Sequence, residues 1–256
     1  MRFASLGSGS EGNALLIECD AGSGGCLLVD CGFSVREVDR RLSRLGRQLH
    51  QLRGILVTHE HADHIGGAFR LAEALGIAVH LTHGTLAAAR GADGYGAAVV
   101  IVPDQPFELH GLTIEPFPVP HDAREPVQFV IDDGRSRLGI LTDIGHPTAH
   151  LPRALADLTA LVLECNHDSH LLAGSDYPPR LKQRISGRYG HLANDDSARV
   201  LQSLDNARLR RVVAAHLSRQ NNRPELAQRA LAAAIGADVD DILVATQDEG
   251  LQWTAA

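Results

Sequence analysis

The sequence predicts an α/β protein in which two β-sheets pack face to face and helices cover their outer surfaces. Short apolar runs bounded by Gly, Ser or Asp, which are typical of strands, lead each half of the chain. Segments with apolar residues at helical spacing separate some of these runs. This order fits two facing sheets better than one doubly wound parallel sheet, in which strand and helix alternate throughout.

The amino-terminal half supplies four expected strands and two helices. Residues 35–45 carry apolar side chains three and four positions apart with charged residues between them, which is the spacing of one helical face. A second helix at residues 66–75 is ended by Gly76. The strands are expected at residues 3–6, 14–19, 26–30 and 54–58.

The second half continues with strands and closes with two helices and a strand pair. Asn194 is expected to cap the first of these helices. Asn222 and Glu225 form an expected capping box for the second, which runs to Ile235. The strands are expected at residues 97–102, 112–119, 127–132, 138–142, 161–164, 211–214, 241–245 and 251–254.

Composition describes an ordinary globular chain. Of its 256 residues, 44% are hydrophobic and 21% charged, which excludes disordered and fibrous classes. We expect a single domain over residues 1–256, with a homo-oligomer left open. The net charge of −7 argues against a broad basic nucleic-acid footprint. It does not exclude an enzyme that meets phosphates through metal ions, because those cations are absent from the sequence charge.

The sequence predicts a cytoplasmic protein with no membrane partner. No apolar run reaches the roughly 18 residues that a membrane helix needs, and the amino terminus lacks the apolar core of a signal peptide. The four cysteines form no C-x-x-C pair, which excludes a zinc ribbon and a thioredoxin motif. In a reducing compartment we expect them to be small buried hydrophobes.

A glycine-rich segment, Gly7-Ser8-Gly9-Ser10-Glu11-Gly12, matches the G-x-G-x-x-G pattern. A dinucleotide site requires a helix directly after it, whereas residues 13–18 are typical of a strand. No Lys follows Gly12, so a phosphate-binding P-loop is excluded too. We expect a tight turn between strands whose backbone N–H groups are available to an anion.

The most informative segment follows the apolar strand that ends at Thr58. His59, His61, Asp63 and His64 come within six positions. In extended backbone His59 and His61 point the same way, whereas Asp63 and His64 fall where the loop turns into a helix. Imidazole and carboxylate are ligands of zinc, manganese and iron. The cluster therefore predicts a metal site.

One loop cannot complete two ligand shells, so further ligands are expected at the ends of other strands. His121, Asp143 and His216 each follow an apolar run and precede a turn. Any one of them alone could be a residue that caps a turn. Their recurrence in the same position favours a shared site, because a scaffold of strands presents its functional groups from its loops.

The chain resembles a known superfamily. Asp30, which ends the strand at 26–30, fits its first motif. The resemblance covers the whole chain and implies a four-layer αββα sandwich of two mixed β-sheets, with metals at the edge where the sheets meet. The pattern that resembles the metallo-β-lactamase superfamily of binuclear hydrolases consists, in order, of His59, His61, Asp63, His64, His121, Asp143 and His216.

Other motifs narrow the resemblance to the YycJ (WalJ) family, which is linked to DNA exonuclease activity. The resemblance implies a phosphodiesterase that acts on nucleic acid, with DNA as the expected substrate. The chain is similar also to tRNase Z and the RNase J group, but no β-CASP insertion separates Asp143 from His216. The motifs are residues 7–13, 163–168, 190–195 and 215–222.

The resemblance also implies how two divalent cations are held. His59, His61 and His121 hold the first metal. The second metal is held by Asp63, His64 and His216, and Asp143 bridges the two metals. Zinc, manganese and iron all occur in the superfamily, so the ligands leave the metal open. A metal-bridging hydroxide is expected to attack phosphorus, with Asp63 accepting a proton from that water.

The departing sugar oxygen needs a proton, and His191 is the expected acid. It lies in a Gly-flanked loop, and Glu164 at the end of a strand is expected to orient it, as in the Glu–His pair of tRNase Z. The alternatives are that His191 only bonds its own loop, or that His167 is the acid.

Two surface segments are expected to contact substrate. Ser218, Arg219 and Asn221 follow His216 and are placed to hold a flanking phosphate, with a solvated turn as the alternative. A basic stretch that includes Arg180 and Arg184 is expected to contact phosphates, with a solvated face as the alternative.

Aromatic residues are scarce, so no stacking platform for single strands is evident. Tyr177 and Tyr189, which flank the basic stretch, are the plausible stacking residues. The alternative function is a small-molecule hydrolase on the same fold, such as a cyclic phosphodiesterase, a lactonase or a glyoxalase-II-like thioesterase, which the acidic charge favours. A non-catalytic metal-binding module is disfavoured because no ligand position is lost.

Overall fold

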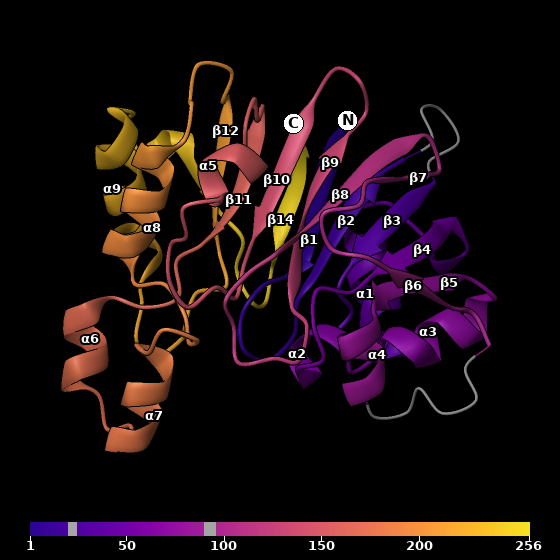
Figure 1. Cartoon of the computed structure of the whole chain (residues 1–256), viewed down its shortest axis with the longest axis horizontal. Helices are drawn as coiled ribbons and strands as arrows, with labels where there is room; N and C mark the ends of the chain where they lie inside the picture. The colour runs from indigo at the N-terminus through magenta and orange to yellow at the C-terminus, as the bar shows by residue number, and fades with distance from the viewer. Residues whose placement is uncertain (20–24, 90–95) are drawn as a thin grey trace.

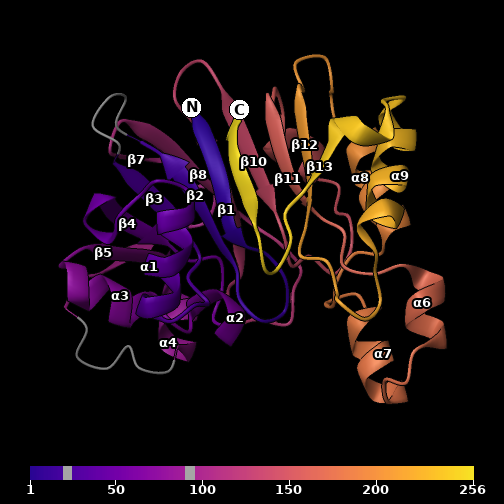
Figure 2. The same ribbon diagram turned by 180° about the vertical axis from the view of Figure 1, so that it is seen from behind.

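A computed structural model describes residues 1–19, 25–89 and 96–256. Two sheets pack face to face in the centre of the molecule, with helices on both outer sides (Figures 1 and 2). The predicted αββα sandwich is confirmed. Within the described ranges, no helix is long and apolar enough to cross a membrane.

The first sheet is built mainly from the amino-terminal half of the chain. Its strands from β3 to β6 are parallel, whereas β14, β1, β2 and β3 pair antiparallel. In spatial order the seven strands are β14 (Leu251–Ala255), β1 (Arg2–Gly7), β2 (Ala14–Glu18), β3 (Cys26–Val29), β4 (Leu52–Leu56), β5 (Ala78–Thr82) and β6 (Ala98–Ile101).

The second sheet is mixed in the same way. Its strands from β10 to β13 are parallel, and those from β7 to β10 pair antiparallel. In spatial order the seven strands are β13 (Ile242–Val244), β12 (Arg211–Ala215), β11 (Ala160–Glu164), β10 (Arg137–Leu141), β9 (Val127–Asp132), β8 (Leu112–Pro118) and β7 (Phe107–Leu109).

Three apolar layers hold the sandwich together. One joins the inner faces of the sheets, one lies under α1 and α3, and one lies under α8 and α9. The helices are α1 (Val35–Arg44), α2 (Ala62–Ile65), α3 (Ala68–Leu75), α4 (His83–Ala88), α5 (Leu151–Ala154), α6 (Ser169–Gly174), α7 (Pro179–Ile185), α8 (Asn194–Ser203) and α9 (Pro224–Ile235), with 3-10 turns at Leu49–Gln51 and Val239–Asp241.

The predicted strands and long helices are confirmed, whereas both predicted caps are wrong. Helix α8 already includes Asn194, and its N-cap is Ala193. Helix α9 has Arg223 as its N-cap and makes no side-chain capping bond. The reason is tertiary: the side chains of Asn194 and Asn222 bond each other at 2.9 and 3.0 Å. The sequence analysis also missed β5, β7, α4, α5, α6 and α7, all short segments with weak periodicity.

Candidate metal centre

The carboxyl ends of the parallel strands of both sheets face one edge of the sandwich, where α2 lies (Figure 1). After β4 the chain bends at Glu60, passes His61, the extended N-cap of α2, and then turns through Asp63 and His64. The loop after β3 approaches this turn so closely that a Cβ on Gly32 would lie 2.0 Å from the Asp63 carbonyl oxygen. Glycine is therefore required at position 32 for the two loops to meet.

Three histidines from the two sheets form a first group of potential ligands. His59 Nε2 lies 3.0 Å from His61 Nδ1, and His121 Nε2 lies 3.3 Å from the same nitrogen. His59 and His61 follow β4, whereas His121 follows β8 in the other sheet. Their nitrogens converge to within 4.8 Å of one another, which is close enough for one ion.

A second group converges beside the first. Asp63 Oδ2 lies 3.4 Å from His64 Nε2 and 3.5 Å from His216 Nε2. His216 follows β12, so this group also draws on both sheets. These three ligand atoms also lie within 4.8 Å of one another.

Asp143, which follows β10, lies between the two groups. Its Oδ2 is 3.0 Å from His64 Nε2, in the second group. Its Oδ1 is 3.9 Å from His121 Nε2, in the first group. The carboxylate is 2% exposed and therefore directed into the site rather than into solvent. One oxygen is thus available to each group.

Neighbouring oxygens orient the imidazole rings. His64 Nδ1 lies 2.8 Å from Asp30 Oδ2, and His59 Nδ1 lies 2.9 Å from the hydroxyl of Thr58. His121 Nδ1 lies 3.0 Å from the carbonyl oxygen of Gly190. If an Nδ1–H donates to each of these acceptors, the neutral ring carries its lone pair at Nε2, on the side of the cluster. Such partners characteristically fix the tautomer of metal-binding histidines.

The donor set fits divalent cations. Asp143 Oδ2 and His216 Nε2 are buried, and apart from the contacts with His64 and Asp63 they have no hydrogen-bond partner among the described residues. Burial, the strongest influence, and the charge of nearby His64 together hold the pKa of His59 well below its usual value, so its ring is a neutral ligand. Nitrogen lone pairs that face one another at about 3 Å are repulsive unless a cation or proton lies between them.

The carboxylates make the second group strongly attractive to positive charge. Burial alone would lower the pKa of His216, but Asp143, Asp63 and Glu164 raise it to about 10. Burial alone would raise the pKa of Asp143, but His216 and His64 hold it well below its usual value. Without metal, protons on the histidines supply the compensating charge, and cations compete with those protons for the same nitrogens.

Beside Asp143 lies a buried Glu–His pair. His191 Nδ1 lies 2.7 Å from Glu164 Oε1, and the backbone N–H groups of Ile144 and Leu192 donate to Glu164 Oε2 at 3.1 Å each. Burial alone would raise the pKa of Glu164, but the charge and hydrogen bond of His191 lower it to about 2. His191 Nε2 has no partner among the described residues, and the ring borders the cleft over the clusters.

The glycine-rich loop between β1 and β2 packs directly on these groups. The expected turn between strands is confirmed, since β2 begins at Ala14. The expectation that its backbone N–H groups are available to an anion is wrong, because those of Ser8, Gly9, Glu11, Gly12 and Asn13 all donate to acceptors within the protein. Ser8 Oγ accepts the backbone N–H of His216 at 2.9 Å. Asn13 Nδ2 lies 3.3 Å from Asp63 Oδ2 and 3.1 Å from His64 Nε2. The contact of this motif with the candidate ligands was not predictable from the sequence, because it joins segments about 50 and 208 positions apart.

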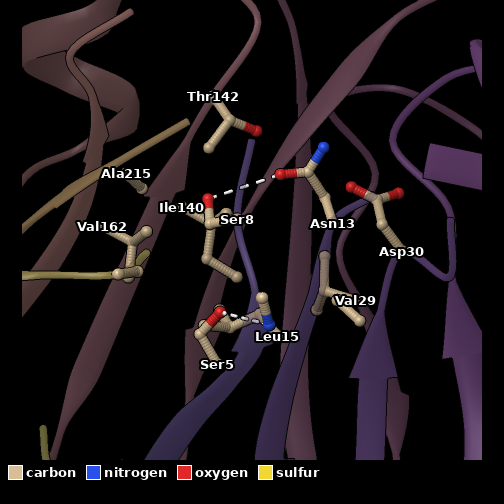
Figure 3. Close-up of a pocket in the computed structure, with 13 residues that line it drawn as sticks. Ser5, Ser8, Asn13, Leu15, Val29, Asp30, Ile140, Thr142, Val162 and Ala215 are labelled. Atoms are coloured by element: carbon tan, nitrogen blue, oxygen red, sulfur yellow. Dashed lines mark hydrogen bonds between the residues drawn. The ribbon is translucent and has the colours of Figure 1, made fainter. Parts of the chain in front are cut away.

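A small, mostly apolar cavity of about 30 Å³ lies between the sheets beneath the clusters, with a few polar side chains in its wall. Figure 3 shows the Ser8 hydroxyl bonded to Asn13 there, with Asp30 and Thr142 lining the same space. Three residues of the cavity wall also contact candidate ligands. Ser8 bonds His216, Asn13 bonds Asp63 and Asp30 bonds His64.

Above the clusters lies an open cleft of about 410 Å³. Helices α6 and α7 project away from the sheets beside it, below α8 in Figure 1. Four of the candidate ligands lie in its walls: His61, Asp63, Asp143 and His216. Residues Tyr177, Leu181, Arg184 and Ile185 form the wall on the side of α7.

Of the five residues predicted to contact substrate, two line the cleft and three do not. The two that line it are Ser218 and Arg184. Arg180 is exposed but is not among the cleft residues. Arg219 lies in a neighbouring pocket and pairs with Asp248. Asn221 has no exposed surface, so this structure gives it no contact with a ligand in the cleft.

Two further residues qualify the sequence interpretation. His167, the alternative acid, is 2% exposed and does not line the cleft. Asp122, which the sequence analysis passed over, has an oxygen 3.4 Å from His121 Nε2 and 3.6 Å from His61 Nε2. The sequence signal that could have indicated Asp122 as a site residue is its position directly after His121.

Comparison with known proteins places this architecture in a family. A β-lactamase superfamily domain matches residues 26–217. Exodeoxyribonuclease YycJ of Bacillus anthracis is 31% identical over 243 residues, which cover 92% of this chain and 89% of that protein.

Two crystal structures share the fold at low sequence identity. The metallo-β-lactamase fold protein YhfI from Bacillus subtilis has a TM-score of 0.73 at 14% identity, over 99% of this chain and 98% of that one. Zn²⁺-bound PqqB from Methylobacterium extorquens has a TM-score of 0.72 at 19% identity, over 100% of both chains. The chain therefore belongs to the β-lactamase superfamily, has the metallo-β-lactamase fold, and is a relative of exodeoxyribonuclease YycJ.

Proposed function

We propose that the protein is a metal-dependent phosphodiester hydrolase that removes nucleotides from the ends of DNA. The observation that carries this proposal is the placement of two ligand groups on either side of Asp143, in one cleft with the His191–Glu164 pair. The similarity to exodeoxyribonuclease YycJ supports DNA as the substrate. We propose that residues 1–256 act as one domain, without a β-CASP insertion, in the cytoplasm.

In this proposal His59, His61 and His121 hold one divalent cation. Asp63, His64 and His216 would hold a second, with Asp143 shared. When bound, the two cations would neutralise phosphate charge and lower the pKa of water. The donor set of imidazole and carboxylate suits zinc, manganese and iron, and zinc is supported by the zinc-bound relative in fold.

The side chains of this chain then have separate tasks. The Asp63 carboxylate accepts a proton from the attacking water. Glu164 accepts the Nδ1–H of His191 and so fixes the tautomer with a proton donor available at Nε2 once the ring is protonated. His191 Nε2 faces the cleft and delivers that proton to the departing sugar oxygen. Without this proton the sugar oxygen would have to depart as an alkoxide, which is a poor leaving group.

Phosphates beyond the reacting one are held by Arg184 and Ser218 in this proposal. Both line the cleft, and the Arg184 guanidinium, whose Nε donates to Asp122, has further N–H groups that can donate to a phosphate oxygen. A single cation at the cleft suffices for positioning, because the bound metals carry most of the positive charge that the acidic chain lacks.

The test is a substrate panel with the protein loaded with zinc or with manganese. The panel holds end-labelled single- and double-stranded DNA, RNA, closed circular DNA, cyclic nucleotides, a lactone and a thioester. We expect mononucleotides from linear DNA and no cleavage of circular DNA. The His61→Ala and Asp63→Asn variants serve as inactive controls. Hydrolysis of the small esters without any cleavage of DNA would favour the alternative of a small-molecule hydrolase.

A further inference from the structure

Helix α7 carries an apolar stripe that the fold does not bury. None of the residues of α7, all within the described part of the chain, is buried. Leu181 and Ile185 lie four positions apart and so on one face of the helix. Tyr177 precedes the helix, and all three side chains line the cleft that contains Asp63 and His216. An amphipathic helix normally turns its apolar face to the core, whereas this one turns it to the reactive groups.

The stripe is held in a fixed position next to the His191–Glu164 pair. The backbone N–H of His191 donates to the carbonyl oxygen of Ile185 at 2.8 Å. Arg184 Nε donates to Asp122 Oδ2 at 2.6 Å, and Asp122 in turn contacts His121. The carboxyl end of α7 is therefore fastened at two points to the site, one of them the residue that the proposed function makes the acid.

The chemistry of this wall fits an unpaired nucleobase. A flat aromatic ring with two aliphatic side chains beside it offers a surface on which any base can stack without hydrogen-bond readout. Arg184 on the same wall supplies positive charge for the phosphate attached to that base. A base within a duplex cannot use this surface, because its faces are covered by the adjacent base pairs.

We propose that Tyr177, Leu181 and Ile185 form a subsite for one unpaired nucleobase, on the leaving-group side of the scissile phosphate. This inference rests on the proposed function, because the side of the phosphate is set by His191 as the acid. It assigns the substrate as a single-stranded or frayed end. It also assigns α7, with Tyr177 just before it, as the element that selects this end.

The test removes, separately and together, the aromatic ring of Tyr177 and the nucleobase that it would contact. Metal-loaded wild type, Tyr177→Ala and Tyr177→Phe are compared on single-stranded DNA that is intact or has an abasic residue on one side or the other of the terminal linkage. Tyr189→Ala is the matched control, since Tyr189 is an aromatic residue near the site that is 60% exposed and does not line the cleft.

We expect Tyr177→Ala to raise KM for intact single strands by about tenfold, in line with the loss of one stacked base, and Tyr177→Phe to restore it. An abasic residue on the leaving-group side should cost the wild type a similar factor and cost Tyr177→Ala nothing more. Binding is read independently with a phosphorothioate strand that carries 2-aminopurine at the same position. Its fluorescence should be quenched by wild type and by Tyr177→Phe, but not by Tyr177→Ala.

Equal effects of Tyr177→Ala and Tyr189→Ala, or an abasic penalty that persists unchanged in Tyr177→Ala, would overturn the subsite. So would a wild-type preference for blunt duplex over single strands. Bis(p-nitrophenyl) phosphate, which has no base, separates this failure from failure of the proposed function. If the protein cleaves that ester but no nucleic acid, the proposed function itself is wrong.

Discussion

The hydroxyl of Ser8 accepts the backbone N–H of His216 at 2.9 Å, although the two residues are 208 positions apart. Ser8 belongs to the loop after β1 in the first sheet, and His216 follows β12 in the second. This bond therefore joins the two sheets at the level of the ligands. Both residues are buried, so solvent does not compete for the N–H group.

Replacing Ser8 with Ala should weaken both the fold and the second ligand group. The His216 N–H would be left buried and unpaired, at a cost of about 1–3 kcal/mol. Thermal unfolding should show the loss of stability, and elemental analysis at limiting metal should show less than the wild-type metal content. Ser10→Ala is the control, because Ser10 is exposed on the same loop. Identical metal content and stability in the two variants would contradict this role of Ser8.

Removal of metal should lower the stability of the whole protein. The nitrogens of His59, His61 and His121 face one another at about 3 Å, and a ligand that binds only the folded state stabilises it by mass action. At a free metal concentration a thousandfold above Kd this amounts to about 4 kcal/mol. Melting curves with and without a chelator measure the difference. Elemental analysis should give two ions per chain, and a single ion would contradict the binuclear proposal.

Replacing His191 with Ala should slow cleavage in a way that depends on the leaving group. A sugar oxygen needs a proton in the transition state, so turnover of DNA should fall by about 10²- to 10⁴-fold. Bis(p-nitrophenyl) phosphate releases a stable phenolate and should lose much less. The comparison of kcat for the two substrates checks this. Equal losses would show that His191 acts only through the structure of its loop.

Acid should weaken helix α1, because Glu37 pairs with Arg40 and Arg41 of the same helix. Hydrogen bonds from Arg40 and Arg41 outweigh partial burial and lower the pKa of Glu37 to about 2, from a usual 4.5. Since the folded pKa is below the unfolded one, this stabilisation is complete above about pH 4.5 and is lost as the pH falls toward 2. Denaturant unfolding of Glu37→Gln should show a shallower pH dependence than wild type in that window. Parallel curves would contradict the assignment.

Much of the site could be predicted because its chemistry is local in the sequence. An apolar strand followed at once by His59 or Asp143 is visible without a structure, since the strand and the ligand are neighbours in the chain. The layers of the sandwich were predictable for the same reason, because strand periodicity and helix periodicity are local patterns.

Contacts between distant segments could not be predicted in this way. The approach of Asn13 to Asp63 spans 50 positions and depends on how two loops pack, which no periodicity encodes. The expected cap at Asn194 failed because Asn222 competes for the same side chain from another segment. Helix α7 was missed because its residues are exposed or half-exposed and give no buried stripe.

Three strand ends at the site turn through left-handed backbone without glycine: φ is 62° at Asp30, 49° at Asp143 and 56° at His216. Side chains other than glycine adopt this region at a cost of about 1–2 kcal/mol per residue. The polypeptide keeps these bends because only there do the carboxylate and imidazole groups reach the shared edge. The reactive end of the sandwich thus stores backbone strain at three corners. A descendant free of selection for catalysis would relieve that strain by accepting glycine there.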